Sequence, residues 1–519
     1  MSTERLTVPG LVRRWAQEQP DRRFVVTEDD ALTYGELARR SADVASWFAS
    51  LEVGKGTRVG VLMPNGTAWP VVAIGASRTG ATLVPLSTFL RPPELAAQLH
   101  TAGVEHLVLV ASFLSRDYVA DLAEISPQLV AGTARFVEEL PRLRSITVWD
   151  GDGPVVDDGT SRLPLVDALD AAVRPADDLA VVFTSGSRGR PKGVIHTHGG
   201  ALGATAAGLD ARRLGRDDHL YIPMPFFWVG GFGTGLLSTL VAGATLLTEA
   251  RPDPERTLPF LERERVSLFR GWPDQAAALA RDRRFAAADL SSLRAGSLDA
   301  VLPADLQAAP GTRANLLGMT ESFGPYCGER LDQTLPPGKE GSCGRAFAGV
   351  ELRIVDLDAG TPVGPGAVGE IELRGPNLMR GICGRTRAET FTEDGFYPTG
   401  DLGRLDADGY LFLTGRRDDM FKVRGATVYP SEIEAALRTI PGVGRALVAD
   451  VERDGVTAVA AAVIPDGAAP ITVDDLDREA RARLSSFKVP TRWLVIAADD
   501  VPMMSTGKVD KAALQKLFE

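Results

Sequence analysis

The order of hydrophobic and polar positions divides the chain into two parts. In the first part, residues 36–50 repeat apolar side chains at helical spacing and predict an amphipathic helix. Residues 59–63 read VGVLM and predict a buried strand that ends at a Pro-Asn-Gly turn. The same alternation recurs at three further apolar runs, residues 105–110, 179–183 and 244–247. Helices that alternate with buried strands are typical of an α/β chain with mostly parallel sheets.

The pattern changes toward the C-terminus. Residues 406–409 (DADG) predict a hairpin turn, residues 410–413 a strand, and residues 415–419 (GRRDD) a charged link. A small unit follows, and it should begin with a helix at Ser431 that forms a capping box with Glu434. Its remaining predicted elements are strands at residues 445–449 and 458–463, a helix at residues 472–484 and a strand at residues 492–496. A charged link between a large and a small unit indicates either a hinge or a solvated connector.

Composition narrows the classes of function. The 519 residues carry a net charge of −11, which argues against general nucleic-acid binding but allows a local basic pocket. Three widely spaced cysteines indicate a reducing compartment and no disulfide framework. The first residues lack the apolar core of a signal peptide, and no apolar run approaches the ~20 residues that span a bilayer. We therefore expect a cytoplasmic protein that is not integral to a membrane.

A phosphate-binding loop is the first candidate site. Residues 184–193 read TSGSRGRPKG and follow an apolar strand. Such a stretch suits an anion, because glycines turn backbone N–H groups toward it and hydroxyl and lysine groups bind its oxygens. The residues concerned are Thr184, Ser185, Gly186, Ser187, Gly189, Lys192 and Gly193. No Gly-Lys-Ser/Thr triplet follows, so the loop is not of the Walker type, and by itself it could be an ordinary surface loop.

Four further stretches carry groups that could bind a nucleotide or a metal. Residues 315–321 (NLLGMTE) end in Thr320 and Glu321, and residues 397–401 (YPTGD) end in Asp401. The other two are the charged link itself and residues 502–508 (PMMSTGK), which end in Lys508. Each has a commoner interpretation when taken singly: a solvated loop carboxylate, a turn-stabilising aspartate, a connector or an exposed lysine. Their shared order and spacing point to one family.

From Leu32 to Lys508 the chain resembles the adenylate-forming superfamily, which includes acyl-CoA synthetases, peptide-synthetase adenylation domains and beetle luciferases. The resemblance implies an N-terminal adenylation domain at residues 1–414, a hinge at residues 415–419 and a C-terminal lid at residues 420–519. It also implies a fold class: an α/β protein whose large domain contains two α/β sheet layers and a β-barrel-like part, with a small mobile α+β lid.

The resemblance also assigns roles to residues. The loop from Thr184 to Lys192 would hold the β- and γ-phosphates of ATP, Thr320 the α-phosphate and Glu321 the Mg²⁺ ion. The ribose would be bound by Asp401 with Arg416, the adenine pocket would be formed by Gly296, Ser297 and Asn315, and Gly318 would be a further cofactor-binding residue. Asp418 would be the hinge residue, Lys508 the lysine required for adenylation, and Gly425 the glycine that leaves room for pantetheine. ATP, Mg²⁺ and coenzyme A are the implied cofactors.

The implied reaction has two steps. A carboxylate attacks the α-phosphorus of ATP and releases pyrophosphate, and a thiol then displaces AMP from the acyl-adenylate after the lid rotates. Three positions depart from the family pattern: Arg188 replaces a threonine, Leu317 replaces a tyrosine that stacks on adenine, and residues 296–298 replace a glycine-rich turn. None of these departures removes a catalytic charge, and Arg188 either adds a contact to the polyphosphate or points to solvent.

The acyl pocket is expected at residues 225–233 (PFFWVGGFG), where the family forms its pocket wall. No acidic residue occurs from Tyr221 to Leu247, so an amino-acid substrate would leave its ammonium group unpaired. We therefore expect a hydrophobic carboxylic acid, either a fatty acid or a bulky alicyclic one. The predicted pocket residues are Phe227, Trp228, Gly231, Leu317 and Met319. Trp228 is either a gate over the pocket or a packing residue.

Coenzyme A is the expected acceptor, because residues 350–399 contain no insertion of the kind that blocks lid rotation in fatty acyl-AMP ligases. Transfer to the pantetheine thiol of a separate acyl-carrier protein is the main alternative. A luciferase-like oxygenase has no specific support in the sequence. A non-catalytic nucleotide-binding relative, suggested by Arg188 and Leu317, is disfavoured by the retained Glu321, Asp401 and Lys508. A homodimer stays open.

Overall fold

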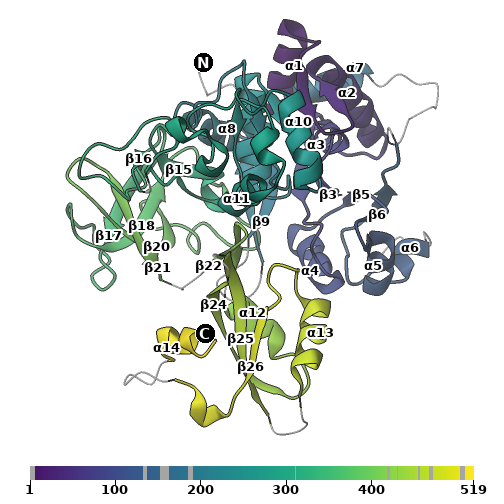
Figure 1. Ribbon diagram of the computed structural model, residues 1–519. Helices are drawn as coiled ribbons and strands as arrows, with labels where there is room; N and C mark the ends of the chain where they lie inside the picture. The colour runs from purple at the N-terminus through teal and green to yellow at the C-terminus, as the bar shows by residue number, and fades with distance from the viewer. Residues whose placement is uncertain are drawn as a thin grey trace. The chain divides into compact units, whose positions relative to one another are not determined.

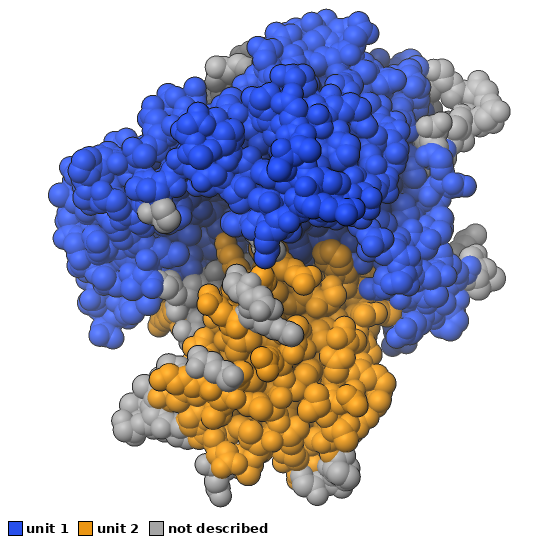
Figure 2. Space-filling view, viewed as in Figure 1, with its two compact units in different colours: residues 1–88, 99–183, 193–415 blue, residues 89–98, 184–192, 416–519 orange. Residues whose placement is uncertain are grey.

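The computed structural model describes the chain in two compact units (Figure 2). The first comprises residues 1–88, 99–183 and 193–415, and the second residues 89–98, 184–192 and 416–519. The description leaves out residues 1–5, 132–136, 152, 154–162, 185–190, 310, 418–420, 429, 454–455, 467–470, 503–508 and 519. No described helix combines the length and apolar character needed to cross a bilayer.

A seven-stranded sheet has the strand order β19-β10-β9-β4-β3-β5-β8. Its strands are β3 (Arg58–Leu62), β4 (Thr82–Pro85), β5 (His106–Leu109), β8 (Ser145–Val148), β9 (Asp178–Thr184), β10 (Lys192–Thr197) and β19 (Gly381–Ile382). β3 pairs in parallel with β4 and β5, whereas β19 runs antiparallel to β10. The helices of this part of the chain are α2 (Tyr34–Ser50), α3 (Ala68–Arg78), α7 (Leu163–Ala172) and α8 (His198–Ala207), while α4 (Pro92–Ala102) is divided between the two units. The predicted parallel α/β pattern is confirmed, including the helix and the strands expected in this region.

A five-stranded sheet has the order β13-β11-β12-β1-β2. It is formed by β1 (Arg23–Val26), β2 (Ala31–Thr33), β11 (His219–Tyr221), β12 (Thr245–Leu247) and β13 (Leu268–Phe269), with only β2 antiparallel to its neighbour. The accompanying helices are α1 (Val8–Glu18), the π-helix η2 (Gly230–Leu237), α9 (Ser238–Ala242), α10 (Pro254–Arg263) and α11 (Pro273–Arg281). A hydrophobic core that includes Trp69, Phe48 and Phe226 connects the two sheets.

The rest of the first unit is rich in β-structure (Figure 1). A three-stranded sheet contains β14 (Leu317–Met319), β15 (Gly324–Gly328) and β16 (Arg345–Ala346). A four-stranded sheet contains β17 (Glu351–Val355), β18 (Gly369–Arg374), β20 (Tyr397–Leu405) and β21 (Leu411–Arg416). The smaller elements of the unit are β6 (Ser112–Phe113), β7 (Arg116–Asp117), α5 (Tyr118–Ile125), α6 (Gln128–Ala131) and the 3₁₀ turns η3 (Phe285–Ala287), η4 (Asp299–Val301), η5 (Ala304–Leu306) and η6 (Thr320–Ser322).

The second unit is built on the three-stranded sheet β24 (Val443–Arg453), β25 (Val456–Pro465) and β26 (Arg492–Val495). Helices α12 (Pro430–Leu437) and α13 (Val473–Arg483) cover one face through Val448 and Ala461, and α14 (Lys511–Lys516) packs on the other through Leu447 and Ala462. Successive residues of a strand point to opposite faces, so alternate apolar residues supply both cores. The remaining elements are β22 (Phe421–Val423), β23 (Ala426–Val428) and the 3₁₀ turn η7 (Ala498–Asp500).

The predicted strands and helices of this small unit are confirmed, but the capping box is wrong. Helix α12 begins at Pro430, so Ser431 lies inside its first turn. The carboxylate of Glu434 accepts a hydrogen bond from the backbone N–H of Val448 in β24 at 3.0 Å. The carboxylate of Glu434 therefore bonds to a neighbouring strand and not, as the local motif predicted, to the N-terminus of its own helix.

Candidate active site

Thr320 and Glu321 lie in the tight turn η6 that follows β14. Phe323 adopts a left-handed backbone conformation (φ 54°) at the end of this turn, and the chain reverses into β15. Glu321 is buried, and the hydroxyl of Tyr397 donates a hydrogen bond of 3.0 Å to its Oε1. The turn therefore fixes a buried carboxylate whose orientation is set by a residue from another sheet.

Glu321 suits a magnesium ion that is shared with a nucleotide. Mg²⁺ is usually held by one or two carboxylates together with substrate phosphates, rather than by a cage of protein groups. Among the described residues, no group of three or more His, Cys, Asp or Glu side chains is arranged to hold a metal. A single buried carboxylate fits the shared mode.

Strand β20 carries Asp401 as well as Tyr397. Asp401 is buried, and its backbone N–H donates to the hydroxyl of Thr399 at 3.0 Å. That hydroxyl in turn donates to the backbone oxygen of Ile371 in β18 at 2.7 Å. Gly400 has φ 76°, a conformation that glycine adopts without strain. The strand thus fixes the backbone at Asp401 and orients Glu321 through Tyr397.

A buried histidine lies beneath the η6 turn. The ring of His196 in β10 lies 4.8 Å from that of Phe323. Burial lowers the pKa of His196 to about 3, so this ring is neutral near pH 7. The sequence singled out neither His196 nor Tyr397, because their partners are far away along the chain.

Three of the residues predicted to bind the nucleotide in this region, Gly296, Ser297 and Gly318, have structural roles. The hydroxyl of Ser297 accepts a hydrogen bond from the backbone N–H of Phe269 at 3.0 Å, which ties this segment to the end of β13. Gly296 has φ 94°, and a Cβ on Gly318 would stand against the carbonyl group of Gly324. Asn315 is exposed. Adenine binding by these residues stays a prediction.

The predicted acyl wall is a loop that Asn65 holds in place. The side chain of Asn65 accepts from the backbone N–H of Phe226 at 2.8 Å and donates to the backbone oxygen of Met224 at 3.0 Å. Trp228 stacks edge-on against Phe227 and against Trp272, with ring centroids 5.2 Å and 5.8 Å away. The aromatic wall therefore includes Trp272, which the sequence did not single out.

Helix η2 follows this loop, and its second residue is Gly231. A Cβ there would collide with the carbonyl oxygens of Met224 and Pro225, so the loop can approach the helix only where a glycine stands. Leu317 and Met319, the other predicted pocket residues, are partly buried and pack against the core of the β-rich sheets.

Part of the predicted nucleotide site lies outside the described residues. Thr184 ends β9 and Lys192 begins β10. The residues between them that carry predictions are Ser185, Gly186, Ser187, Arg188 and Gly189, and all lie outside the description, as do Asp418, Lys508 and the side chain of Arg416. In the second unit, Arg424 and Gly425 have φ 49° and 78° and form the two-residue turn between β22 and β23.

Comparison with known proteins agrees with these observations. The family model for the AMP-binding enzyme matches residues 12–383, and the model for the AMP-binding enzyme C-terminal domain matches residues 432–508. A feruloyl-CoA synthase from Amycolatopsis sp is 33% identical over 514 residues, covering 98% of each chain. The 3-[(3aS,4S,7aS)-7a-methyl-1,5-dioxo-octahydro-1H-inden-4-yl]propanoyl:CoA ligase from Rhodococcus jostii (strain RHA1) is 32% identical over 538 residues, covering 99% of each chain.

Solved structures share the fold over nearly the whole chain. The amide bond synthetase McbA from Marinactinospora thermotolerans superposes with a TM-score of 0.80 at 24% identity, covering 99% of this chain and 100% of its own. The o-succinylbenzoate CoA synthetase from Bacillus subtilis gives a TM-score of 0.75 at 23% identity, covering 98% of each chain. The chain therefore belongs to the AMP-binding enzyme family and is an adenylate-forming ligase of the acyl-CoA synthetase type.

Proposed function

We propose that this protein activates a carboxylic acid with a largely apolar body to its acyl-adenylate and transfers the acyl group to coenzyme A. The observation that carries the proposal is the buried Glu321, oriented by Tyr397 from the strand that also holds Asp401. Strand β20 therefore orients the carboxylate that would bind Mg²⁺ and also carries the carboxylate that would accept the ribose hydroxyls. Relatives that match over nearly the whole chain are named for the formation of CoA thioesters, which supports the same proposal.

In the first step, the carboxylate of the acid attacks the α-phosphorus of ATP, and the bond to the leaving pyrophosphate breaks. The catalysis comes from positioning and charge neutralisation, because no covalent enzyme intermediate is needed. Glu321 would hold Mg²⁺, which neutralises polyphosphate charge when bound. Thr320 and Lys508 would contact the α-phosphate, and Asp401 would accept the ribose hydroxyls.

In the second step, the thiolate of coenzyme A attacks the acyl carbon and AMP leaves. Coenzyme A is favoured as the acceptor because relatives over 98% of the chain are named for it. Gly425 lies at the tip of the β22–β23 turn, where the missing side chain would leave room for pantetheine. The pantetheine thiol of an acyl-carrier protein is the competing acceptor, so thioester formation on such a carrier must be measured separately.

The acid is proposed to carry an apolar body because the loop at residues 225–228 presents aromatic side chains. Phe227 and Trp228 pack together there, and no acidic residue occurs between Tyr221 and Leu247 to pair an ammonium group. The relatives named above act on a hydroxycinnamic-type acid and on a propanoic acid with a fused ring system. We therefore favour ring-bearing acids over amino acids.

A pyrophosphate-release panel tests the proposal. Fatty, aryl and alicyclic acids are supplied with ATP and Mg²⁺, and thioester formation is measured with coenzyme A or with a pantetheinylated carrier protein. Release with at least one class of acid, followed by acyl-CoA formation, is the expected result. If no class of acid causes pyrophosphate release, the protein is better explained as a non-catalytic nucleotide-binding protein. Thioester formation only on the carrier protein would exclude coenzyme A as the acceptor.

Replacement of Lys508 separates the two steps. We expect Lys508→Ala to lower acyl-adenylate formation by ~100-fold or more, because a cation that neutralises developing charge is lost. The same variant should still form thioester from acyl-adenylate supplied ready-made, within ~3-fold of the unmodified protein, because this step does not require the lysine. An equal loss in both half-reactions would contradict the assigned role.

A further inference from the structure

Arg270 lies where the acyl wall begins, and nothing above gives it a role. It follows β13 directly, and its backbone N–H donates to the backbone oxygen of Tyr221, the last residue of β11, at 2.8 Å. β11 and β13 are parallel neighbours, and β11 leads into the loop that carries Trp228. Ligands of α/β sheets bind at the carboxyl ends of such strands. Arg270 is therefore at the edge of the sheet where a substrate is expected.

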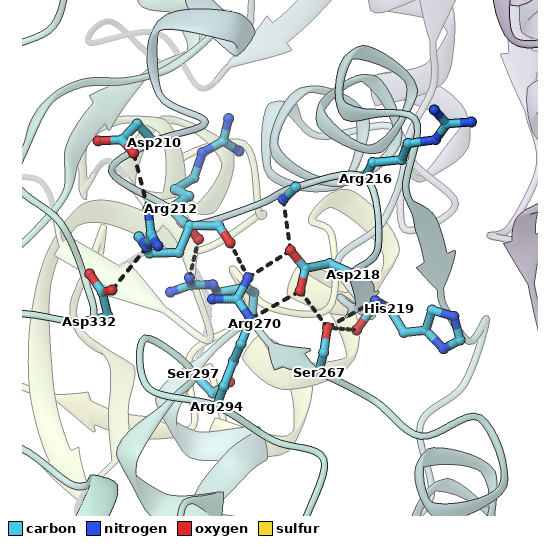
Figure 3. Close-up of polar contacts among 12 residues, drawn as sticks. Asp210, Arg212, Arg216, Asp218, His219, Ser267, Arg270, Arg294, Ser297 and Asp332 are labelled. Atoms are coloured by element: carbon cyan, nitrogen blue, oxygen red, sulfur yellow. Dashed lines mark hydrogen bonds and ion pairs between the residues drawn. The ribbon is translucent and has the colours of Figure 1, made fainter. Parts of the chain in front are cut away.

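The guanidinium of Arg270 has no carboxylate partner among the described side chains. Its Nη2 donates to the backbone oxygen of Arg212 at 2.6 Å (Figure 3). The nearby carboxylate of Asp218 is already occupied: Arg294 donates to both its oxygens at 3.0 Å and 2.6 Å, and the hydroxyl of Ser267 donates at 2.8 Å.

Arginines surround Arg270. Burial, together with the positive charges of Arg212 and Arg294, lowers the pKa of Arg270 to about 9, and the negative charge of Asp218 opposes this shift. Arg212 also has no carboxylate partner among the residues that the structure describes, but its three guanidinium nitrogens donate to neutral oxygens, namely those of Gly208, Ser238, Thr234 and Thr205. Arg270 makes one such contact, so its guanidinium retains donors and remains charged at pH 7.

Two polar groups that closely follow Arg270 in the chain have no hydrogen-bond partner in the described structure. The indole Nε1 of Trp272 and the side-chain oxygen of Gln275 are both buried and unpaired. Buried polar groups without partners are rare in folded proteins, and they call for an explanation such as a ligand. Two side chains of the segment that follows Arg270 share this feature, and the ring of Trp272 packs against that of Trp228 in the acyl wall.

A glycine stands next to the guanidinium. The Nη2 of Arg270 lies 3.5 Å from where a Cβ on Gly296 would stand, and Gly296 has φ 94° and so disfavours any side chain. The guanidinium therefore lies next to the segment that we assign to the nucleotide, two residues along the chain from the Trp272 that packs on Trp228.

We propose that Arg270 binds an anionic oxygen group, of the kind that a second carboxylate provides, at the far end of the acid that the enzyme activates. This inference rests on the proposed ligase function. The forked guanidinium can donate two parallel hydrogen bonds to a carboxylate, and the unpaired N–H of Trp272 is a further donor in the same segment. The Trp228–Trp272 pair packs against the apolar body. The substrate class is thus a dicarboxylic acid with an apolar middle.

Matched pairs of acids test the subsite. Para-carboxycinnamic acid is compared with para-methylcinnamic acid, and a homologous series of α,ω-dicarboxylic acids with the corresponding methyl-terminated acids, by pyrophosphate release. We expect kcat/KM for the best diacid to exceed that of its methyl partner by ~10- to 100-fold, because a hydrogen bond between charged groups is made only by the diacid. The para-acetyl analogue serves as the neutral acceptor and should fall between them.

Replacement of Arg270 should reverse the preference. Arg270→Met should raise KM for the diacid ~10-fold or more while KM for the methyl acid stays constant or falls, and Arg270→Lys should keep part of the preference. The matched control is Arg281→Met, the same change at an exposed position of α11, which should leave selectivity unchanged. A merely structural role of Arg270 would lower activity on both acids equally, so reduced stability alone cannot mimic a reversal.

The outcomes separate the subsite from the ligase function. Activity on the methyl acids with no advantage for any diacid, or an Arg270→Met effect confined to KM for ATP, overturns the subsite and leaves the ligase function standing. A preference for the acetyl analogue over the carboxylate overturns the anionic assignment. The absence of pyrophosphate release with every acid overturns both proposals.

Discussion

The hydroxyl of Tyr397 donates to a carboxylate oxygen of Glu321 across 76 residues of sequence. A hydrogen bond to a charged group contributes about 1.5–3 kcal/mol, enough to fix which way the carboxylate points. If Glu321 holds Mg²⁺, its orientation decides how well the ion is shared with the polyphosphate. Tyr397 is then a positioning residue.

We expect Tyr397→Phe to raise the Mg²⁺ concentration for half-maximal pyrophosphate release by ~10-fold, because partners of metal ligands typically alter metal affinity by this much. Activity at saturating Mg²⁺ should largely recover. Tyr410→Phe, which removes a buried tyrosine hydroxyl elsewhere, is the control and should leave the Mg²⁺ dependence unchanged. An equal loss of activity at all Mg²⁺ concentrations in Tyr397→Phe would count against the positioning role.

His198 makes stability depend on pH. It begins α8, and its Nδ1 accepts a hydrogen bond from the backbone N–H of Val8 at 3.2 Å. Burial lowers its pKa to about 4, so the folded protein keeps it neutral. The unfolded chain binds a proton near pH 6.5, so stability is complete above that value and is lost as the pH falls from about 6.5 to about 4. The loss at the lower limit is on the order of 3 kcal/mol.

We expect His198→Asn to flatten this dependence, because the amide oxygen can accept the bond from Val8 and does not titrate. The measurement is the thermal midpoint of unfolding between pH 7 and pH 4, where the variant should lose fewer degrees than the unmodified protein. Some dependence should remain, because His196 is also buried with a lowered pKa of about 3. An unchanged slope would mean that other groups dominate the acid response.

At the residue scale, the sequence marked where functional groups occur but not what holds them. Thr320 and Glu321 follow an apolar stretch with a glycine, so their position just after a strand was predictable, whereas Asp401 lies inside β20 and not after a turn. Tyr397 was not assigned to Glu321, because Tyr397 lies in a different sheet from the strands that flank Glu321, and only the tertiary fold brings the two together. Arg270 belongs to no motif. The structure is needed to see that it has no carboxylate partner within the described part of the chain, because the nearby carboxylate of Asp218 bonds to Arg294.

At the scale of elements, the π-helix η2 depends on the glycine at its second position. Its eight residues include four glycines, and Gly231 stands directly against the backbone of Met224 and Pro225. The backbone carbonyl groups of Met224 and Pro225 cannot move aside for a methyl group at position 231 as easily as a flexible side chain could. The loop that carries Phe227 and Trp228 should therefore be displaced by any larger residue at this position.

We expect Gly231→Ala to destabilise the protein by ~2–3 kcal/mol or more and to abolish acid activation, through overpacking against carbonyl groups. Gly230→Ala is the matched control, because its Cβ would meet the flexible end of Met224 at 2.6 Å and the effect should stay within ~1 kcal/mol. Thermal unfolding and pyrophosphate release measure both variants. Equal tolerance of the two alanines would show that the loop moves freely.

Elements with a clear hydrophobic period were predictable, and those shaped by contacts were not. Residues 36–50 repeat apolar positions at helical spacing, and α2 ends at Ser50 as expected. The π-helix went unpredicted because glycines carry no hydrophobic signal at its wider period. Glu434 matched a local capping motif, yet the free N–H of Val448 in a neighbouring strand took its carboxylate. Local patterns therefore fail where a tertiary partner competes for the same group.

At the scale of the whole molecule, the chain consists of two compact units, with separate cores, and the last break between them falls between Gly415 and Arg416. The charged stretch GRRDD spans this break. A reaction with two chemically different steps can use such a link, because one pose of the small unit would deliver Lys508 and another would admit the thiol. Hinges absorb this motion at a few backbone positions.

We expect Asp418→Pro to slow thioester formation by ~10-fold or more and adenylation by no more than ~3-fold, because proline fixes φ at its own position and restricts the residue before it. Asp418→Ala removes the same carboxylate but leaves the backbone free, and it should impair neither step comparably. Each half-reaction is measured separately, as pyrophosphate release and as coenzyme A transfer from supplied acyl-adenylate. Slower adenylation than transfer in Asp418→Pro, or equal effects of proline and alanine, would assign the defect to the lost charge and remove the hinge from the mechanism.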